Sequence, residues 1–343
     1  MLRKYPLIKW SLISLISFVL LVVGFGWWFM SLLPSKEEFP DLSSAKPESL
    51  PYLAQNQSAP RGKILTVVTS TDTMGTSGKS TGYELTELSR AYYVFQANGF
   101  EVDIASPKGG EPKVVIDDED MGIYDYAFLN DSLAQFKTRN TIPVREVEAE
   151  NYQAIFFVGG KGAMFDFPDN AYIQSIVRDL YEAGGVVGAV CHGPAALINV
   201  TLDGGQHLLA NKQVSGFTNE EELLLIPDAK SIFPFLLQDK LSEQGALFEK
   251  GPMYLEQVSH ENQLITGQNP WSTWKVAETM VVELGHVPKQ RQITPEENAV
   301  NVLNAFETKG SSQAKYMIKK LTLAENKEIE RILIAKHSVL AAM

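Results

Sequence analysis

Thiols are scarce in this sequence: among 343 residues there is a single cysteine, Cys191. An intramolecular disulfide and a thiolate-rich metal site are therefore excluded. The five histidines show no His-x-x-x-His or comparable ligand spacing, so we expect no zinc or other metal site. A function of Cys191 must then lie in its chemistry.

Positive charge is also in short supply. Lysine and arginine total 30 against 41 aspartates and glutamates, which gives a formal net charge of −11. A field of this sign repels phosphate backbones, so we expect no nucleic-acid partner. The apolar fraction of 45% excludes disorder for most of the chain and, with the length, indicates one large domain with appendages.

Charge is absent between Lys9 and Lys36, and residues 10–33 are almost uniformly apolar. A helix of this length spans roughly 36 Å, enough to cross a bilayer core of about 30 Å. The cations in residues 1–9 predict a cytoplasmic n-region followed by a single-pass transmembrane signal anchor. The rest of the chain would then be extracytoplasmic, and periplasmic in a bacterium. A cleaved signal peptide fits less well because no small-x-small cleavage site follows, although cleavage stays open.

Two further segments lie outside the predicted domain. Residues 34–61 are rich in proline and lack apolar periodicity, which indicates a linker that spaces the anchor from the domain. Residues 286–343 predict a helical extension, in which Thr294 and Glu297 form a capping box with Pro295 at the first helical position. The extension either faces a partner or membrane or packs on the domain, and packing is slightly favoured.

The central part of the chain alternates strand and helix patterns. Strands are predicted at 63–69, 100–105, 154–158 and 186–190, and helices at 83–98 and 173–181. Strands that are apolar on both faces indicate an α/β domain with a mostly parallel sheet covered by helices on both sides. In such sheets, functional sites form at the carboxyl ends of the strands.

The segment 188–194, Gly-Ala-Val-Cys-His-Gly-Pro, carries the chemical signal. It places Cys191 on a sharp turn between a buried strand and a predicted helix, whose amino terminus would favour a thiolate and stabilise an oxyanion. Gly188 and Gly193 permit the tight backbone. A buried core cysteine is the alternative, but it leaves the flanking His-Gly-Pro unexplained, so a nucleophile is favoured.

Several segments together resemble one known family, the ThiJ/PfpI superfamily of class I glutamine amidotransferase-like folds. The similarity is greatest to the branch of glutathione-independent glyoxalase III enzymes and heat-shock chaperones. It implies a flavodoxin-like, doubly wound domain over about 62–285, preceded here by the predicted transmembrane helix. The segments that carry the resemblance are 82–88, 105–110, 159–169, 186–197, 214–222 and 264–270.

The resemblance also implies a role for each residue of the site. Cys191 corresponds to the nucleophile, His192 to its base and Glu222 to the carboxylate that orients the histidine. Glu87 falls where the family has a carboxyl that is hydrogen-bonded to the cysteine sulfur. The neighbouring Glu220 and Glu221 of the Asn-Glu-Glu-Glu run are interpreted as exposed helix-dipole partners only.

The same resemblance implies an oxyanion and substrate loop at residues 160–162. Gly160 and the backbone amide of His192 are the expected oxyanion donors, and Lys161 and Gly162 continue the loop. Many relatives have histidine where this chain has Lys161, so the substrate preference is open. A true glutaminase is disfavoured, because His260 is followed directly by the acid rather than being separated from it by one residue.

The function implied by the resemblance is cofactor-independent, cysteine-dependent processing of reactive aldehydes, such as methylglyoxal to lactate, with protein deglycation as an extension. Such an enzyme is a glyoxalase III-like lyase or a related cysteine hydrolase. Two alternatives stay open: a holdase-type stress chaperone with a redox-sensing cysteine, and a cysteine amidase or peptidase acting on an amide. The sequence does not fix the oligomeric state, and a homodimer is compatible with it.

Overall fold

The computed structural model describes residues 6–32, 41–54, 58–117 and 120–323. It divides into two units, one formed by 1–41 with 330–343 and the other by 42–329. The described part of the first unit is essentially helix α1 (Pro6–Leu32). Parts of the predicted n-region, linker and carboxyl-terminal extension lie outside the described residues, namely 1–5, 33–40, 55–57 and 324–343.

The prediction of a transmembrane signal anchor over 10–33 is wrong. Crossing a bilayer core of about 30 Å takes about 20 consecutive, predominantly apolar residues in one helix. In the part of the chain that the structure describes, no helix has both the length and the apolar content to span a membrane. The single-pass topology with an extracytoplasmic domain depended on that anchor and is corrected with it.

The predicted mostly parallel sheet is confirmed in the second unit. Its strand order is β10-β11-β7-β6-β1-β3-β5, and every neighbouring pair is parallel except β10 with β11. The central strands β6 and β7 are buried throughout, as their apolar sequences predict. The strands are β1 (Lys63–Val67), β3 (Glu101–Ser106), β5 (Ile142–Pro143), β6 (Ala154–Phe157), β7 (Val186–Val190), β10 (Val258–Glu261) and β11 (Leu264–Gly267).

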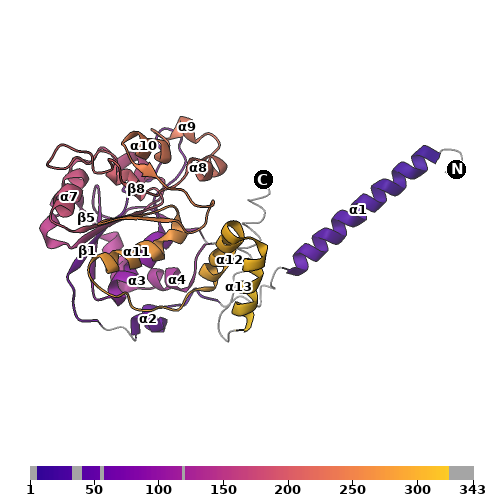
Figure 1. The fold of residues 1–343 in the computed structure, drawn as a ribbon, viewed down its shortest axis with the longest axis horizontal. Helices are drawn as coiled ribbons and strands as arrows, with labels where there is room; N and C mark the ends of the chain where they lie inside the picture. The colour runs from indigo at the N-terminus through magenta and orange to yellow at the C-terminus, as the bar shows by residue number, and fades with distance from the viewer. Residues whose placement is uncertain (1–5, 33–40, 55–57, 118–119, 324–343) are drawn as a thin grey trace. The chain divides into compact units, whose positions relative to one another are not determined.

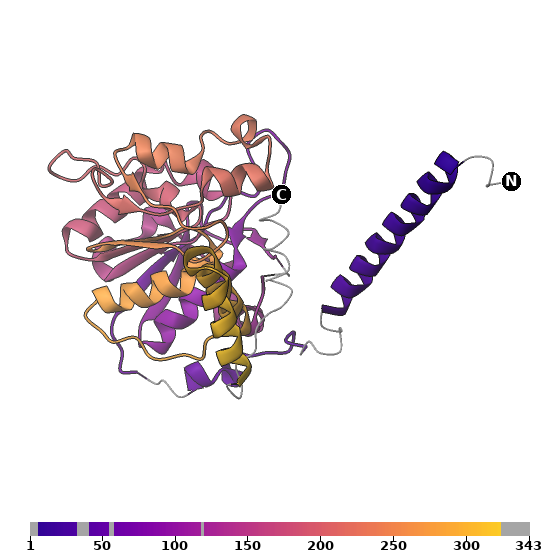
Figure 2. The same cartoon turned by 45° about the vertical axis from the view of Figure 1, so that its right-hand side comes forward.

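Helices cover both faces of this sheet, which makes the domain doubly wound (Figure 1). Helices α3 (Leu85–Ala97) and α11 (Thr273–Glu283) pack together on one face, and α7 (Ala171–Glu182) contacts β6 and β7 from the other (Figure 2). The shorter helices are α2 (Pro51–Ala54), α4 (Ile123–Leu129), α5 (Ser132–Arg139), α6 (Ala163–Asp166), α8 (Asn219–Leu225), α9 (Ala229–Ile232) and α10 (Leu237–Glu243).

Short elements complete the connections between the strands and helices. Two small parallel ladders pair β2 (Tyr83–Glu84) with β4 (Val114–Val115) and β8 (Gln213–Val214) with β9 (Leu247–Phe248). The remaining turns are the 3-10 helices η3 (Pro47–Ser49), η4 (Val144–Glu146), η5 (Ala149–Asn151), η6 (Gly193–Leu197) and η7 (Pro270–Ser272).

The end of the proline-rich segment packs on the domain instead of acting only as a spacer. Leu50 and Tyr52 are 1% and 4% exposed, and Asn98 of α3 donates to the Tyr52 hydroxyl at 3.2 Å. Two isolated apolar side chains among prolines create no periodic pattern, which is why the sequence did not reveal this contact.

The carboxyl-terminal extension forms a helical hairpin of α12 (Pro295–Lys309) and α13 (Ser311–Leu323). The predicted capping box is confirmed: the Glu297 amide donates to Thr294 Oγ1 at 3.2 Å, and the Thr294 amide donates to Glu297 Oε2 at 3.1 Å. Val300 and Val302 of α12 are buried. The start of α12 lies against the domain, because a Cβ at Gly122 would lie 3.3 Å from Glu296 Oε2.

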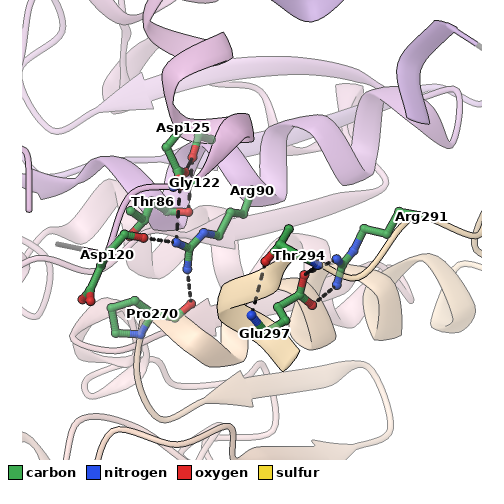
Figure 3. Close-up of polar contacts among 10 residues, drawn as sticks. Thr86, Arg90, Asp120, Gly122, Asp125, Pro270, Arg291, Thr294 and Glu297 are labelled. Carbon is green, nitrogen blue, oxygen red and sulfur yellow. Dashed lines mark hydrogen bonds and ion pairs between the residues drawn. The ribbon is translucent and has the colours of Figure 1, made fainter. Parts of the chain in front are cut away.

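Arg291 fastens this extension to the domain (Figure 3). Both terminal nitrogens of its guanidinium donate to the Glu297 carboxylate, and Nε donates to Glu278 of α11 at 2.9 Å. The guanidinium carbon lies 3.9 Å from the ring centroid of Trp274. A planar guanidinium is well suited to a bidentate carboxylate and an aromatic face at once.

Candidate active site

Cys191 follows the last residue of β7 and lies in a strained turn. Its φ is 58°, in the left-handed region that is uncommon for residues other than glycine. Two backbone hydrogen bonds hold it there, one from the Cys191 amide to Gly267 O at 3.0 Å and one from the Phe217 amide to Cys191 O at 2.9 Å. Strain of this kind, about 1–3 kcal/mol, persists where the surroundings over-determine the backbone and is common at functional sites.

The structure brings the predicted cysteine, histidine and glutamate into one hydrogen-bonded chain. Cys191 Sγ is 3.2 Å from His192 Nδ1, and His192 Nε2 is 2.6 Å from Glu222 Oε2. An ionised carboxylate only accepts, so Nε2 donates to Glu222 and Nδ1 is left to accept the thiol proton. The imidazole packs against Phe217 with ring centroids 4.6 Å apart, which fixes its plane.

Glu222 is the ionised member of this chain. Burial alone would raise the pKa of its carboxyl, but the charge and hydrogen bond of His192 outweigh burial and hold the pKa below its usual range. Glu222 lies in the first turn of α8, which begins after the capping residue Thr218. A carboxylate kept ionised beside Nε2 stabilises the imidazolium that forms when the thiol loses its proton.

Glu87 lies beside the thiol, in the first turn of α3, and is fully buried. Its Oε2 accepts the Gly159 amide at 2.6 Å. Its Oε1 has no nitrogen or oxygen partner among the described residues, and the neighbouring hydrogen-bonding group is the Cys191 thiol. Burial, aided by the charge of Glu84, raises the pKa of Glu87 well above its usual range. Glu87 is therefore protonated near neutral pH and can donate to the sulfur.

Cys191 is a neutral thiol in the resting site. Burial raises the pKa of the thiol, the carboxyls of Glu87 and Glu84 raise it further, and Lys161 opposes them. The expected help from a helix dipole is small, because the following element is not an α-helix but the five-residue 3-10 helix η6. Pro194 near its start and the tight Gly193 turn account for this short form. The thiolate must therefore form by proton transfer to His192.

The loop after β6 backs directly onto the cysteine turn. A Cβ at Gly159 would lie 2.7 Å from Glu87 Oε2, 2.8 Å from Cys191 Cβ and 2.8 Å from the His192 amide nitrogen. Gly160 has a φ of 102°, and a Cβ there would lie 2.2 Å from Gly82 O. Only glycine fits either position. The predicted oxyanion donors, the amides of Gly160 and His192, thus belong to two loops in contact.

Lys161 and Gly162 continue this loop as expected. The charge of Lys161 lowers the pKa of the Cys191 thiol and of the Glu222 carboxyl, so its ammonium group acts on both ends of the hydrogen-bonded chain. Gly162 precedes α6, and a Cβ there would lie 2.7 Å from Thr71 O. The structure brings His192, Glu222, Glu87 and the charge of Lys161 to the Cys191 thiol, and Gly160 and Gly162 belong to the loop that follows β6. The catalytic roles of these residues stay predictions.

The interpretation of Glu221 as an exposed dipole partner is wrong. Its side chain is fully buried, and its carboxylate accepts five hydrogen bonds of 2.8–3.1 Å. The Thr-x-x-Glu capping box that starts at Thr218 was the signal that could have identified it. Glu221 thereby fixes the turn of α8 that carries Glu222. The five donors are the Thr218 amide and hydroxyl, the Tyr254 amide, and the side-chain amides of Gln268 and Asn269.

A further carboxyl at the site, that of Glu84, was not identified from the sequence. Burial raises the pKa of Glu84 to about 7, and its charge raises the pKa values of both Glu87 and Cys191. Its position three residues before Glu87 was visible in the sequence, but nothing in the sequence indicated that both acids lie beside one thiol.

A sheet of this topology with a strained cysteine at the end of β7 defines a class of cysteine-containing α/β proteins, and comparison with known families identifies which one. Residues 79–283 match the model of the DJ-1/PfpI family. The chain belongs to this family, which confirms the resemblance found in the sequence.

Individual relatives cover the same part of the chain. A protein of Schizosaccharomyces pombe named glutathione-independent glyoxalase is 31% identical over 60% of this chain and 90% of its own. The X-ray structure of the Rapid Encystment Protein of Francisella tularensis is 38% identical, with a TM-score of 0.62, and covers 65% of this chain and 99% of its own. Glyoxalase III of Candida albicans is 26% identical with a TM-score of 0.58, over 66% of this chain and 98% of its own.

Proposed function

We propose that this chain is a glutathione-independent glyoxalase of the glyoxalase III type, which converts methylglyoxal to lactate without a cofactor. The observation that carries the proposal is the buried hydrogen-bonded chain Cys191–His192–Glu222, with the carboxyl of Glu87 beside the thiol. Relatives aligned over nearly their whole length bear the name of this activity.

The reaction begins with addition of the thiol to the aldehyde. His192 Nδ1, 3.2 Å from Sγ, takes the thiol proton while the sulfur bonds to the aldehyde carbon. The carbonyl electron pair moves to oxygen, where the amides of Gly160 and His192 stabilise the negative charge. Glu222 stabilises the imidazolium, and Glu87 hydrogen-bonds the sulfur while it carries charge.

An internal redox exchange follows. The proton on the former aldehyde carbon is removed, and the C–H electron pair forms a double bond to the neighbouring carbonyl carbon. The π electrons of that carbonyl move to its oxygen, which takes the thiol proton from the His192 imidazolium, and the first oxygen stays anionic at the amides of Gly160 and His192. Reprotonation of that second carbon gives a thioester on the first and an alcohol on the second. One carbon is oxidised and the other reduced, so the electrons balance within the substrate.

Water completes the cycle by hydrolysing the thioester. His192 takes a proton from the attacking water, whose addition forms a second oxyanion at the same amides. The C–S bond then breaks, and the sulfur receives that proton from His192. The exposed fractions of Glu87, Cys191, His192 and Glu222 are between 0% and 4%. Such limited access favours a small aldehyde as substrate.

The test is turnover of methylglyoxal by the full chain without glutathione, comparing wild type with Cys191→Ala. Wild type is expected to form lactate, and loss of the nucleophile should reduce kcat by about 10³-fold or more. Glu220→Gln is a suitable control, because Glu220 is exposed and ion-paired with Lys250.

Turnover by Cys191→Ala at the wild-type rate would contradict this mechanism. The holdase and amidase hypotheses stay predictions, as do the extension to protein deglycation and the homodimer. A folded wild type that forms no lactate would favour one of the first two.

A further inference from the structure

The proposed reaction needs more proton transfers than the hydrogen-bonded histidine can serve. His192 Nδ1 faces Cys191 Sγ, and Nε2 is held by Glu222. Both ring nitrogens are therefore occupied in moving the thiol proton. The transfer from the first substrate carbon to the second requires another group beside the thiol, and this requirement rests on the proposed function.

Glu84 is placed to reach that position. It ends β2 and directly precedes α3, yet its side chain makes no capping hydrogen bond to the helix. Its amide donates to Gly159 O at 3.3 Å, and its nitrogen lies 3.1 Å from where a Cβ of Gly160 would stand. The residue thus lines the oxyanion loop itself.

Accessibility distinguishes Glu84 from the other acid beside the thiol. Glu87 is fully buried, and one of its oxygens is committed to the Gly159 amide. Glu84 keeps part of its surface accessible. The charge of Glu84 acts on the Cys191 thiol, which places its carboxyl near a substrate bonded to the sulfur.

The charges around Glu84 suit a group that both accepts and donates protons. Burial raises its pKa to about 7, Lys161 lowers it, and Asp117 and Asp120 raise it. Asp120 is fixed by the buried Arg90, which donates to its carbonyl oxygen at 2.6 Å (Figure 3). A carboxyl with a pKa near the working pH serves equally as base and as acid.

We propose that Glu84 is a second catalytic residue, which carries the substrate proton between the two carbons while His192 handles only the thiol proton. As a carboxylate, Glu84 removes the proton from the sulfur-bearing carbon, and the C–H electrons form the enediol. As a carboxylic acid, it returns the proton to the adjacent carbon, and the first carbon becomes the thioester. Glu84 ends each cycle ionised, ready for the next.

The test compares wild type, Glu84→Gln and the control Glu220→Gln in the full chain. Turnover of methylglyoxal by Glu84→Gln should fall by about 10²-fold. Alkylation of Cys191 by iodoacetamide should be as fast as in wild type or faster, because the charge that raises the thiol pKa is removed. A merely structural role would slow both processes together.

The pH profile gives a second readout. In wild type, kcat/KM should rise with pH through about 7 as Glu84 becomes a base, and this rise should vanish in Glu84→Gln. Glu84→Asp keeps the carboxyl and should retain measurable turnover. The other groups facing Glu84 are present in every variant, namely Glu87, Cys191, Lys161, Asp117 and Asp120.

Turnover by Glu84→Gln at the control rate would overturn the assignment. Parallel loss of turnover and of thiol alkylation in both Glu84 variants would also overturn it, because that marks a structural role. A wild type that fails to convert methylglyoxal would instead reject the proposed function, and the catalytic role of Glu84 with it.

Discussion

Two groups of buried charges in this domain differ in how completely they are paired. In Figure 3, the Asp125 carboxylate accepts from Arg90, from the Ser89 hydroxyl and from the Gly122 amide. Around the thiol, by contrast, Glu87 Oε1 and Glu222 Oε1 have no nitrogen or oxygen partner among the described residues.

A fully paired buried charge stabilises the fold, whereas an incompletely paired one is available for proton transfer. Arg90 and Asp125 are 3% and 1% exposed and neutralise each other, so the pair joins α3 to the first turn of α4. Glu84 and Glu87 lie beside a thiol, and burial raises the pKa of each. Perturbed carboxyls of this kind are what proton transfer near neutral pH requires.

The largest expected effect on stability comes from breaking the paired group. Arg90→Met should lower the free energy of unfolding by about 3–5 kcal/mol, because it leaves Asp125 buried without its cation. Urea denaturation measures the change. The double variant Arg90→Met/Asp125→Leu should recover much of the loss. A single variant as stable as wild type would show that the ion pair contributes nothing.

Replacing Glu84, whose pKa is raised by burial, should instead increase the free energy of unfolding. The pKa of Glu84 is raised to about 7 in the folded state from an ordinary 4.5, so wild type loses stability as pH rises between these values. Glu84→Gln lacks this loss. It should gain up to about 3 kcal/mol relative to wild type between pH 4 and pH 8. An equal difference between the two proteins at both pH values would refute the raised pKa.

The smallest effect belongs to the cap of α12. Thr294→Ala removes the hydroxyl that accepts the Glu297 amide and should cost about 1 kcal/mol. Turnover should be unchanged, because Thr294 and Glu297 lie in the carboxyl-terminal extension and neither residue belongs to the proposed active site. Thermal unfolding and the methylglyoxal assay, carried out on one preparation, would measure both. A loss of turnover in a folded Thr294→Ala would show that the two groups of charges are coupled.

The features that were predicted from the sequence are those that depend on a few neighbouring residues. The elbow at Cys191 and the capping box at Thr294 depend on a few neighbouring residues, and the structure reproduces both. Burial of Glu221 and the raised pKa of Glu84 depend on segments far apart in the chain, such as the Gln268–Asn269 pair. No local pattern reports such contacts, so both residues emerged only from the fold.

The carboxyl-terminal hairpin shows the same limit. Its first helix follows from the capping box, but no local pattern marks Arg291 as the residue whose guanidinium connects the hairpin to α11. The helix predicted after Cys191 shortened to a 3-10 turn, because Gly193 and Pro194 favour a tight backbone. The transmembrane prediction was based on an apolar pattern alone, and no described helix has the length and apolar content to span a membrane.

Because the chain has one cysteine and that cysteine is the proposed nucleophile, the protein contains its own stoichiometric reporter. One equivalent of a thiol-specific reagent counts competent centres directly, with no background from other sulfhydryls. Suppose that a preparation binds half an equivalent of the reagent under native conditions and a full equivalent in denaturant. All of its thiols are then reduced, but only half of its active sites react, so the other half has been lost without oxidation of the cysteine. Specific activity can thus be normalised to intact centres instead of to total protein.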